Sequence, residues 1–321
     1  MKPSTTSHQP LATSIVLCYQ QEDFVEESIL SMFEQDYRPL QVIICDDCST
    51  DGTVAKIESL LPRAPSDIDV KFVKNKVNLG LSGNINSGFD VSSGDYVFMA
   101  AGDDISVPNR ISRCMEAWSA AGYKHDLICT QFEDIDENSK PTGIVGGSFF
   151  FPDEKLPVHK WRCGATGACA AYSRRVFTEF GPIDTDVRSE DWVLSFRAWL
   201  LGGGLLIEEP LVKHRTHSSS ISVQTRSISD LPSREKRRLA REKVAIGSAG
   251  IAREWSQAWK VMSRDEVIGR KLDRQREVAE MIVHSYQQTK LKLLGNTVKL
   301  AAAGHGRVAL RLFARNIFGM H

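Results

Sequence analysis

The sequence contains no hydrophobic run long enough to cross a membrane. The nearest approach, Ala198 to Ile207, is interrupted by three glycines, whereas a spanning helix needs about 18 to 20 apolar residues. The first ten residues, MKPSTTSHQP, also lack the apolar core of a signal peptide. We therefore expect a cytoplasmic protein that is not integral to a membrane.

The chain also lacks the cysteine pattern of a disulfide-bonded domain. Its seven cysteines are an odd number, and even sets are typical of disulfide frameworks. Cys45 and Cys48 have C-x-x-C spacing, but no second pair at matching spacing completes a zinc site. We interpret the cysteines as packing residues of a protein in a reducing compartment.

The whole chain has a net charge of zero, but each of its two parts is charged. Residues 231–321 hold 19 Lys and Arg against 8 Asp and Glu, which leaves 21 against 32 in residues 1–230. Apolar residues at 42% and charged residues at 25% are typical of a globular protein. The two parts of the chain therefore face different partners, and we expect no nucleic acid among them.

The N-terminal part alternates strand and helix patterns. Ser14–Cys18 and Leu40–Cys45 are short apolar runs rich in β-branched residues, and Val25, Ile29 and Met32 between them have helical spacing. Further strands are expected at Val70–Val73, Tyr96–Ala100 and Leu127–Gln131, with a helix at Gly83–Val91. Strands that are apolar on both faces predict a mostly parallel α/β sheet with crossover helices.

Acidic residues follow the ends of these predicted strands. Asp46 and Asp47 end the second strand, and Asp103 and Asp104 follow the Tyr96 strand. Ligands of open α/β sheets bind beyond the carboxyl ends of the strands. Asp103 and Asp104 suit a Mg²⁺ or Mn²⁺ ion bridging to phosphate, and Asp46 and Asp47 suit hydrogen bonds from a base and ribose. The alternative for each pair is a solvated turn or a helix N-cap.

The later part of the chain changes character twice. A small-residue stretch, GATGACAAYS, precedes Glu190 and Asp191, which open a helix containing Trp192, Phe196 and Trp199. After a Ser-rich stretch, helical periodicity continues to the end. We predict a catalytic domain over 1–225 and a basic α-helical extension over 226–321.

The ordered motifs resemble those of family 2 glycosyltransferases. The segments that carry the resemblance, over about residues 12–220, are Ser14–Gln20, ICDDCSTDGT, Asn78-Leu79-Gly80, Asn84, GDYVFMAAGDD, GATGACAAYS, Phe180-Gly181 and Glu190-Asp191. The resemblance implies a GT-A fold, which is Rossmann-like with a mostly parallel central sheet and flanking helices. It also implies an inverting hexosyltransferase that uses a sugar nucleotide and a divalent cation.

The resemblance also implies roles for residues at the strand ends. Tyr19, Asp46 and Asp47 fall where the family holds the base and ribose. Asp103 falls in the DxD-type motif as a nucleotide contact and metal ligand, with Asp104 as its neighbour. The first acid of the commonest version of that motif is Ala101 in this chain, a departure that bears on metal affinity and donor identity.

Three further positions complete the expected site. Asp191 matches the general base of the family, with Glu190 beside it, and the alternative is a pair of first-turn acids favoured by the helix dipole. His217 matches a histidine near the diphosphate and is a metal-ligand candidate, since neutral imidazole binds divalent cations. Asn84 begins a helix whose backbone N–H groups could lie near phosphate.

The C-terminal tail is basic and contains no acid after Glu280. Arg307, Arg311 and Arg315 are spaced four apart, on one face of a helix. Such a segment suits peripheral binding to an anionic membrane, where a lipid-linked acceptor would lie. The alternative is a helix face that packs on the catalytic domain or on a second copy in a homodimer.

The sequence thus predicts a glycosyltransferase of polysaccharide biosynthesis that moves a sugar from a nucleotide donor to a hydroxyl of a glycan or lipid-linked acceptor. A nucleotidyltransferase of the same fold is disfavoured because SIVLCYQQ contains no G-x-G-T-R-x pattern. A catalytically inactive scaffold or partner protein in glycan assembly stays open because of Ala101.

Overall fold

The computed structural model describes residues 9–218, 220, 234–262 and 265–287. In chain order, its elements are β1 (Ala12–Cys18), α1 (Val25–Phe33), β2 (Leu40–Asp46), α2 (Thr53–Leu60), η1 (Leu61–Arg63), β3 (Ile68–Lys74), α3 (Gly80–Asp90), β4 (Tyr96–Ala101), β5 (Ile105–Ser106), α4 (Arg110–Ala120), β6 (Leu127–Ile135), β7 (Pro141–Gly146), β8 (Phe149–Phe150), η2 (Val158–Lys160), β9 (Gly164–Ala165), η3 (Gly167–Cys169), β10 (Ala170–Ser173), α5 (Arg175–Thr178), α6 (Glu190–Leu201), β11 (Gly204–Arg215), α8 (Arg234–Val261) and α9 (Glu266–Gln287).

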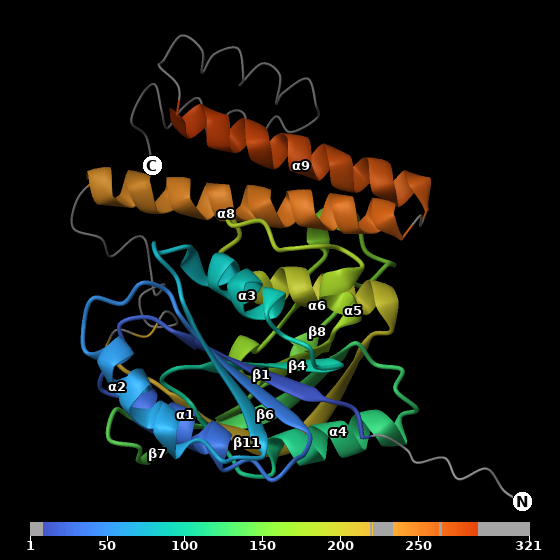
Figure 1. Ribbon diagram of the computed structural model, residues 1–321. Coiled ribbons are helices and arrows are strands. Elements are labelled where there is room, and N and C mark those ends of the chain that lie inside the picture. Colours follow the sequence, from blue (N-terminus) through green and yellow to red (C-terminus); the bar gives the residue numbers. More distant parts are fainter. Residues whose placement is uncertain (1–8, 219, 221–233, 263–264, 288–321) are drawn as a thin grey trace, which may run out of the picture. The chain divides into compact units, whose positions relative to one another are not determined.

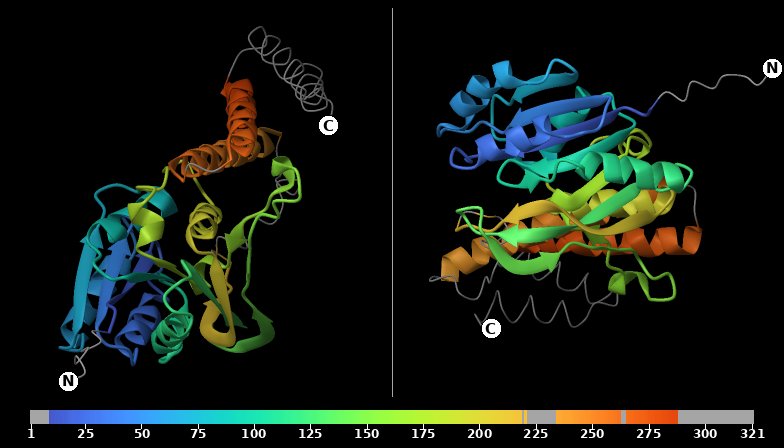
Figure 2. Two further views of the ribbon diagram at one scale, coloured as in Figure 1. Left: turned by 90° about the vertical axis from the view of Figure 1, so that its right-hand side faces the viewer. Right: turned by 90° about the horizontal axis from the view of Figure 1, so that it is seen from below.

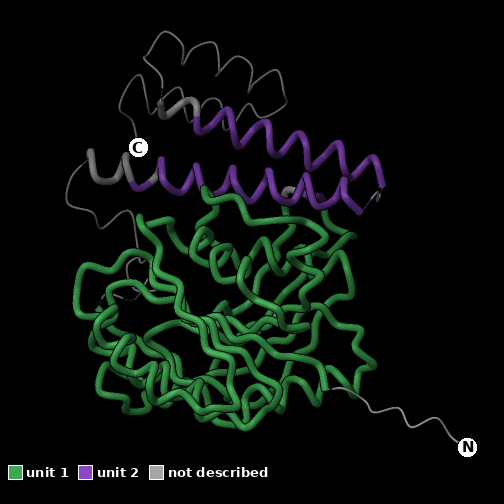
Figure 3. Tube along the Cα trace, viewed as in Figure 1, with its two compact units in different colours: residues 1–156, 160–226 green, residues 157–159, 227–321 purple. Residues whose placement is uncertain are grey.

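The chain divides into two compact units, coloured separately in Figure 3. The first contains residues 1–156 and 160–226, and the second contains 157–159 and 227–321. The predicted domain boundary at 225 stays a prediction. The basic tail, with Lys290, Lys292, Lys299, Arg307, Arg311 and Arg315, lies outside the described residues.

Within the described residues, nine strands form one mixed sheet in the first unit (Figures 1 and 2). Its order is β3-β2-β1-β4-β10-β6-β11-β5, with β7 paired to β6. Strands β1 to β4 are parallel to their neighbours among themselves, and β10 is antiparallel to both β4 and β6. The predicted fold class, a mostly parallel α/β sheet with flanking helices and a helical extension, is confirmed.

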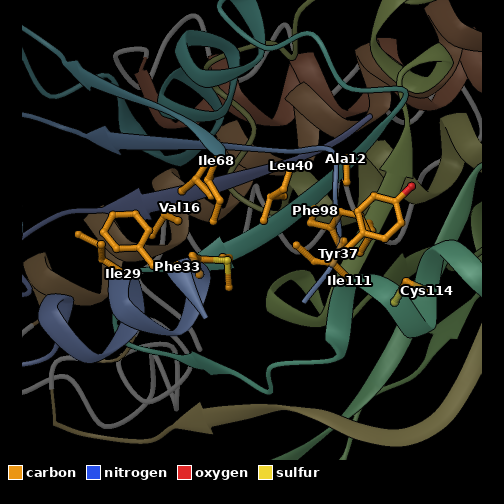
Figure 4. Close-up of a cluster of buried hydrophobic side chains, with 14 of the residues drawn as sticks. Ala12, Val16, Ile29, Phe33, Tyr37, Leu40, Ile68, Phe98, Ile111 and Cys114 are labelled. Atoms are coloured by element: carbon orange, nitrogen blue, oxygen red, sulfur yellow. The ribbon is translucent and has the colours of Figure 1, made fainter. Parts of the chain in front are cut away.

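Helices cover both faces of this sheet, which is why its central strands are apolar on both sides. On one face, α1, α2 and α4 pack on Ala12, Val16 and their neighbours in a continuous apolar core (Figure 4). On the other face, α3 lies so close to the sheet that a Cβ on Gly88 would be 2.7 Å from Ile15 and 2.8 Å from Cys45. This packing fixes the strand register and therefore the positions of the strand ends.

The predicted helix at 83–91 begins earlier than expected, at Gly80. Asp47 accepts hydrogen bonds from the backbone N–H groups of Leu79 and Gly80 and so caps the first turn. The cap comes from a residue 33 positions away from Gly80, so local sequence signals do not reveal it.

In the second unit, helices α8 and α9 pack on each other. Ser256 and Lys260 of α8 both bond Asp273 of α9, at 2.5 and 2.7 Å. The indole N–H of Trp259 donates to the Asp265 carbonyl in the turn between the helices. Among the described helices, none is both long enough and apolar enough to cross a membrane.

Candidate functional site

Acidic residues lie at the carboxyl ends of β2 and β4, on either side of β1. Cys18 pairs with Asp46 across β1 and β2, and Leu17 pairs with Ala101 across β1 and β4. From β1 the strand order proceeds to β2 and β3 on one side, and β4 lies on the other side of β1. The carboxyl end of β1 is therefore a topological switch point, which is where ligands bind in open α/β sheets. Burial is the main cause of the raised pKa of the Cys18 thiol, and the charges of Asp46 and Asp103 add to it. Both carboxylates therefore lie close to one point.

Asp47 supports the fold as a helix cap. Its carboxylate is buried and accepts hydrogen bonds from Asn75 Nδ2 at 3.1 Å, Leu79 N at 2.8 Å and Gly80 N at 2.9 Å. Asp46, also buried, accepts from the backbone N–H and the hydroxyl of Ser49. Leu79 is the N-cap residue of α3, and Asp47 supports this helix start from a distant part of the chain. Contact of either carboxylate with a nucleotide stays a prediction.

Asn84 is also held by internal bonds. Its side chain donates to the Cys45 carbonyl at 3.1 Å and accepts from Asn75 at 2.9 Å. The N–H groups of Leu79 and Gly80 already bond Asp47. The start of α3 therefore has an anionic partner within the protein, and contact between Asn84 and a nucleotide stays a prediction without direct support.

Tyr19 differs from these neighbours because its side chain is 49% exposed at the end of β1. Gln20, the next residue, has φ of +54°, and its side-chain oxygen accepts from the backbone N–H groups of Thr50 and Asp51. These bonds tie the loop after β1 to the loop after β2. Gln20 was not predicted, since nothing in its local sequence signals a contact 30 residues away.

Asp103 and His217 meet at the end of β4. Asp103 Oδ2 lies 3.0 Å from His217 Nε2, and both side chains are mostly buried. The preceding Gly102 allows this turn to approach β1, because a Cβ there would be 2.9 Å from Cys18 Sγ and 3.1 Å from the Leu17 carbonyl oxygen. The structure thus brings together two of the three predicted metal ligands.

Asp104, the third predicted ligand, is buried beside them. Its Oδ1 accepts a hydrogen bond from Arg215 N at 2.8 Å. Burial, followed by the charge of Asp103, raises its pKa to about 7. Its role as a ligand stays a prediction. His214, within β11, contacts Asp134 at 3.2 Å.

The acidic pair Glu190 and Asp191 opens α6. Burial raises the pKa of Glu190 to about 8, with the Asp191 charge as the second cause. Burial also raises the pKa of Asp191 to about 6, against hydrogen bonds from backbone groups that include Ala165 of β9. Two adjacent carboxyl groups whose pKa values are both raised resist simultaneous ionisation, which suits one base and one neutral partner.

The small-residue stretch connects the acidic pair to the strand ends. Gly167 lies against the pair, since a Cβ there would be 3.3 Å from Glu190 Oε1. Three residues later, at Ala170, β10 begins; it runs antiparallel to β4, so its start lies beside the end of β4. Arg110, buried and not predicted as part of the site, donates to the carbonyls of Met99 and Ala168 and ties the two segments together. The acidic pair and Asp103 therefore lie at the same edge of the sheet.

The donor atoms at this edge fit a divalent cation shared with a diphosphate. Asp103 Oδ2 and His217 Nε2 lie 3.0 Å apart, at hydrogen-bonding distance, and carboxylate and imidazole are both ligands that divalent cations accept. Among the described residues there is no cluster of three or more His, Cys, Asp or Glu side chains arranged for a metal ion. The fit is thus to an ion that takes further ligands from the substrate.

A family model described as glycosyl transferase family 2 matches residues 13–181, more than half of the chain. The chain belongs to glycosyl transferase family 2. The match includes Asp46, Asp47, Asp103 and Asp104 and ends before Glu190.

Two curated relatives match over shorter segments. An uncharacterized glycosyltransferase of Haemophilus influenzae is 36% identical over 143 residues, which are 44% of this chain and 42% of the relative. The GalNAc(5)-diNAcBac-PP-undecaprenol beta-1,3-glucosyltransferase of Campylobacter jejuni is 29% identical over 116 residues, or 36% of this chain and 37% of the relative. The chain thus matches less than half the length of either relative.

Two solved structures share the fold of this family 2 member. S. aureus TarS 1-349 in complex with UDP-GlcNAc has a TM-score of 0.53 and 14% identity, over 97% of this chain and 92% of that one. The mannosyltransferase PcManGT of Pyrobaculum calidifontis, in complex with GDP-Man and Mn²⁺, has a TM-score of 0.51 and 15% identity, over 98% and 89%. At these identities the likeness concerns the fold alone.

Proposed function

We propose that this protein is an inverting glycosyltransferase that moves a sugar from a nucleoside diphosphate sugar to a hydroxyl group of a glycan acceptor. The observation that carries the proposal is a half-buried pair of adjacent carboxyl groups, Glu190 and Asp191, at the sheet edge that also holds Asp103 and His217. Membership of glycosyl transferase family 2 supports the reaction class.

In the proposed reaction, Asp191 is the general base. Burial raises the pKa of both carboxyl groups, and the charge of Asp191 further raises that of Glu190, which favours one ionised and one protonated group in the pair. The Asp191 carboxylate takes the proton of the acceptor hydroxyl as its oxygen bonds to the anomeric carbon. The bond between that carbon and the diphosphate breaks, and the diphosphate leaves with the electron pair. One displacement inverts the anomeric centre.

The donor would be held at the switch point of the sheet. The exposed ring of Tyr19 can stack on a base, and Asp46 and Asp47 offer acceptor oxygens to the nucleoside. Asp103, with His217 beside it, would hold Mg²⁺ or Mn²⁺, and a bound cation offsets the charge that develops on the departing diphosphate. A solved structure of similar fold contains GDP-Man and Mn²⁺.

The proposal is tested by release of nucleoside diphosphate from a panel of UDP, GDP and dTDP sugars with Mn²⁺. We expect one donor class to be turned over, and Asp191→Asn and Asp103→Asn to abolish the turnover. An inactive scaffold, the alternative that Ala101 keeps open, would release no nucleotide from any donor. Nucleotide release unchanged in both variants would contradict the assigned roles.

The acceptor proposed here is a lipid-linked glycan at an anionic membrane. The support is the basic tail of the sequence and the printed name of the Campylobacter jejuni relative, which includes an undecaprenol-linked glycan. We expect the full chain to sediment with phosphatidylglycerol vesicles. Three charges held near an anionic surface contribute roughly 1 kcal/mol each. If the face of the tail that carries Arg307, Arg311 and Arg315 contacts the membrane, replacing these three with Gln should weaken the binding more than replacing Lys236, Arg237 and Arg238. Equal binding by both variants would remove the tail from the proposal.

A further inference from the structure

Arg215, at the end of β11, is a charged residue that the proposed reaction does not use. Its side chain is about 1% exposed, and burial of a charge is costly unless the charge is paired and hydrogen-bonded. Its surroundings meet that requirement from several segments of the chain, and two of these segments carry the candidate metal ligands.

The first set of contacts fixes the Asp103–Asp104 turn. Arg215 Nε donates to the Asp103 carbonyl at 2.8 Å, and Arg215 N donates to Asp104 Oδ1 at 2.8 Å. Pairing of β11 with β5, in which Val212 lies opposite Ser106, delivers Arg215 to this turn. One residue therefore holds both the backbone and a carboxylate of the turn that presents Asp103.

The second set of contacts fixes His217. The Arg215 guanidinium lies over the ring of Phe24, 4.9 Å from its centroid, and the His217 ring packs on the same phenylalanine at 4.6 Å. Ser220 joins them as well, since its hydroxyl accepts from His217 N and donates to the Arg215 carbonyl. The position of the imidazole is thus tied to that of the guanidinium.

Glu27 of α1 holds the guanidinium from its outer side. Its Oε2 accepts a hydrogen bond from Arg215 Nη2 and another from the Ser139 hydroxyl at 2.9 Å. Ser139 in turn accepts from Arg215 Nη1 at 3.0 Å. The Glu27 side chain is 52% exposed, so it can be changed without opening the core.

We propose that Arg215 and Glu27 are positioning residues that hold Asp103 and His217 at the spacing a divalent cation requires. This inference rests on the proposed function for the existence of the cation site. The planar fork of arginine makes this possible, because a lysine ammonium cannot bond the Asp103 carbonyl, Glu27 and Ser139 in fixed directions at once. Partners that orient metal ligands typically contribute about 10- to 100-fold to metal affinity.

The test is a titration of the full chain with Mn²⁺, in which the electron paramagnetic resonance signal of free Mn²⁺ measures binding. It is done with Mn²⁺ alone and then with UDP or GDP present. We expect Asp103→Asn to abolish binding, Arg215→Lys to weaken it at least about tenfold, and Glu27→Gln to weaken it about three- to tenfold. Glu26→Gln is the matched control, because Glu26 is the preceding residue of α1, similarly exposed and paired with Arg63.

A merely structural role would lower the melting temperature and leave the Mn²⁺ dissociation constant unchanged, so thermal melts accompany each titration. If Arg215→Lys fails to fold, the Mn²⁺ affinity of Glu27→Gln alone tests whether this pair positions the metal ligands. Wild-type affinity in Glu27→Gln and in any folded Arg215→Lys, with binding lost in Asp103→Asn, overturns this inference and leaves the proposed function intact. Absence of Mn²⁺ binding in the wild-type chain overturns the Asp103 cation site and this inference together.

Discussion

The two acidic regions of the site are built in different ways. Asp46 and Asp47 follow a central strand and receive hydrogen bonds from neighbouring loops, which they organise. Glu190 and Asp191 open a helix, and burial is the largest influence on both of their pKa values. The comparison teaches that two acidic pairs can serve opposite purposes. Asp46 and Asp47 stabilise the fold, whereas Glu190 and Asp191 provide a group that can accept a proton, at some cost in stability.

The largest effect is expected for Asp191→Asn. Loss of a general base typically lowers the rate about 10²- to 10⁴-fold, while nucleoside diphosphate affinity should stay near the wild-type value because Asp191 is not among the proposed nucleotide contacts. Initial rates and calorimetric titration with the nucleotide check this. A variant that keeps most of its transfer activity would contradict the contrast between the two regions.

Asp47→Ala should show the opposite behaviour, with a large loss of stability. Removing the carboxylate leaves the Leu79 N–H at the start of α3 without its acceptor, and the Gly80 N–H keeps only Asn78 Oδ1. Loss of such a cap costs about 1 to 2 kcal/mol. Urea unfolding measures this cost. A free energy of unfolding within about 0.5 kcal/mol of wild type would show that Asp47 is not a structural cap.

The acidic pair should make stability depend on pH. Because the folded pKa of Glu190 is raised above its unfolded value, the folded state binds more protons, so stability falls as pH rises from about 4 towards 8. Glu190→Gln should therefore raise the free energy of unfolding by about 1 to 2 kcal/mol at pH 8 and little at pH 4. Unfolding curves at both pH values check the sign, and equal effects at the two would refute it.

Tyr19→Ala should have the smallest effect. The ring is about half exposed, so stability should change by less than about 0.5 kcal/mol. Loss of stacking on a base should weaken nucleotide binding by about 1 kcal/mol, or roughly fivefold. Titration with the preferred nucleoside diphosphate measures it, with the equally exposed Tyr123 changed to Ala as control. Equal affinity of the two variants would remove Tyr19 from the nucleotide site.

Much of the fold could be predicted from local patterns. The runs at Ser14–Cys18, Leu40–Cys45 and Tyr96–Ala100 became β1, β2 and β4, because strands buried on both faces show a distinctive apolar composition. The rule that ligands bind beyond the carboxyl ends of such strands then located Asp46 and Asp103. The helices α2 and α4 were not predicted, and only the structure supplies them.

The hidden supports of the site could not be predicted in this way. Gln20, Arg110 and Arg215 act through hydrogen bonds to residues distant in the chain, and Arg215 meets Glu27 across 188 positions. No spacing or composition signal marks such a pair, since any surface arginine and glutamate look the same in a sequence.

The sequence by itself determined the alternation of strands and helices at its start, the family, and the acidic residues placed where strands end. Only the tertiary structure decided what each acid does. Hydrogen-bond partners, burial and neighbouring charges make Asp47 the acceptor at the start of α3, join Asp103 to His217, and raise the pKa values of Glu190 and Asp191. These influences act over a few ångströms in space, between residues that the chain alone keeps far apart.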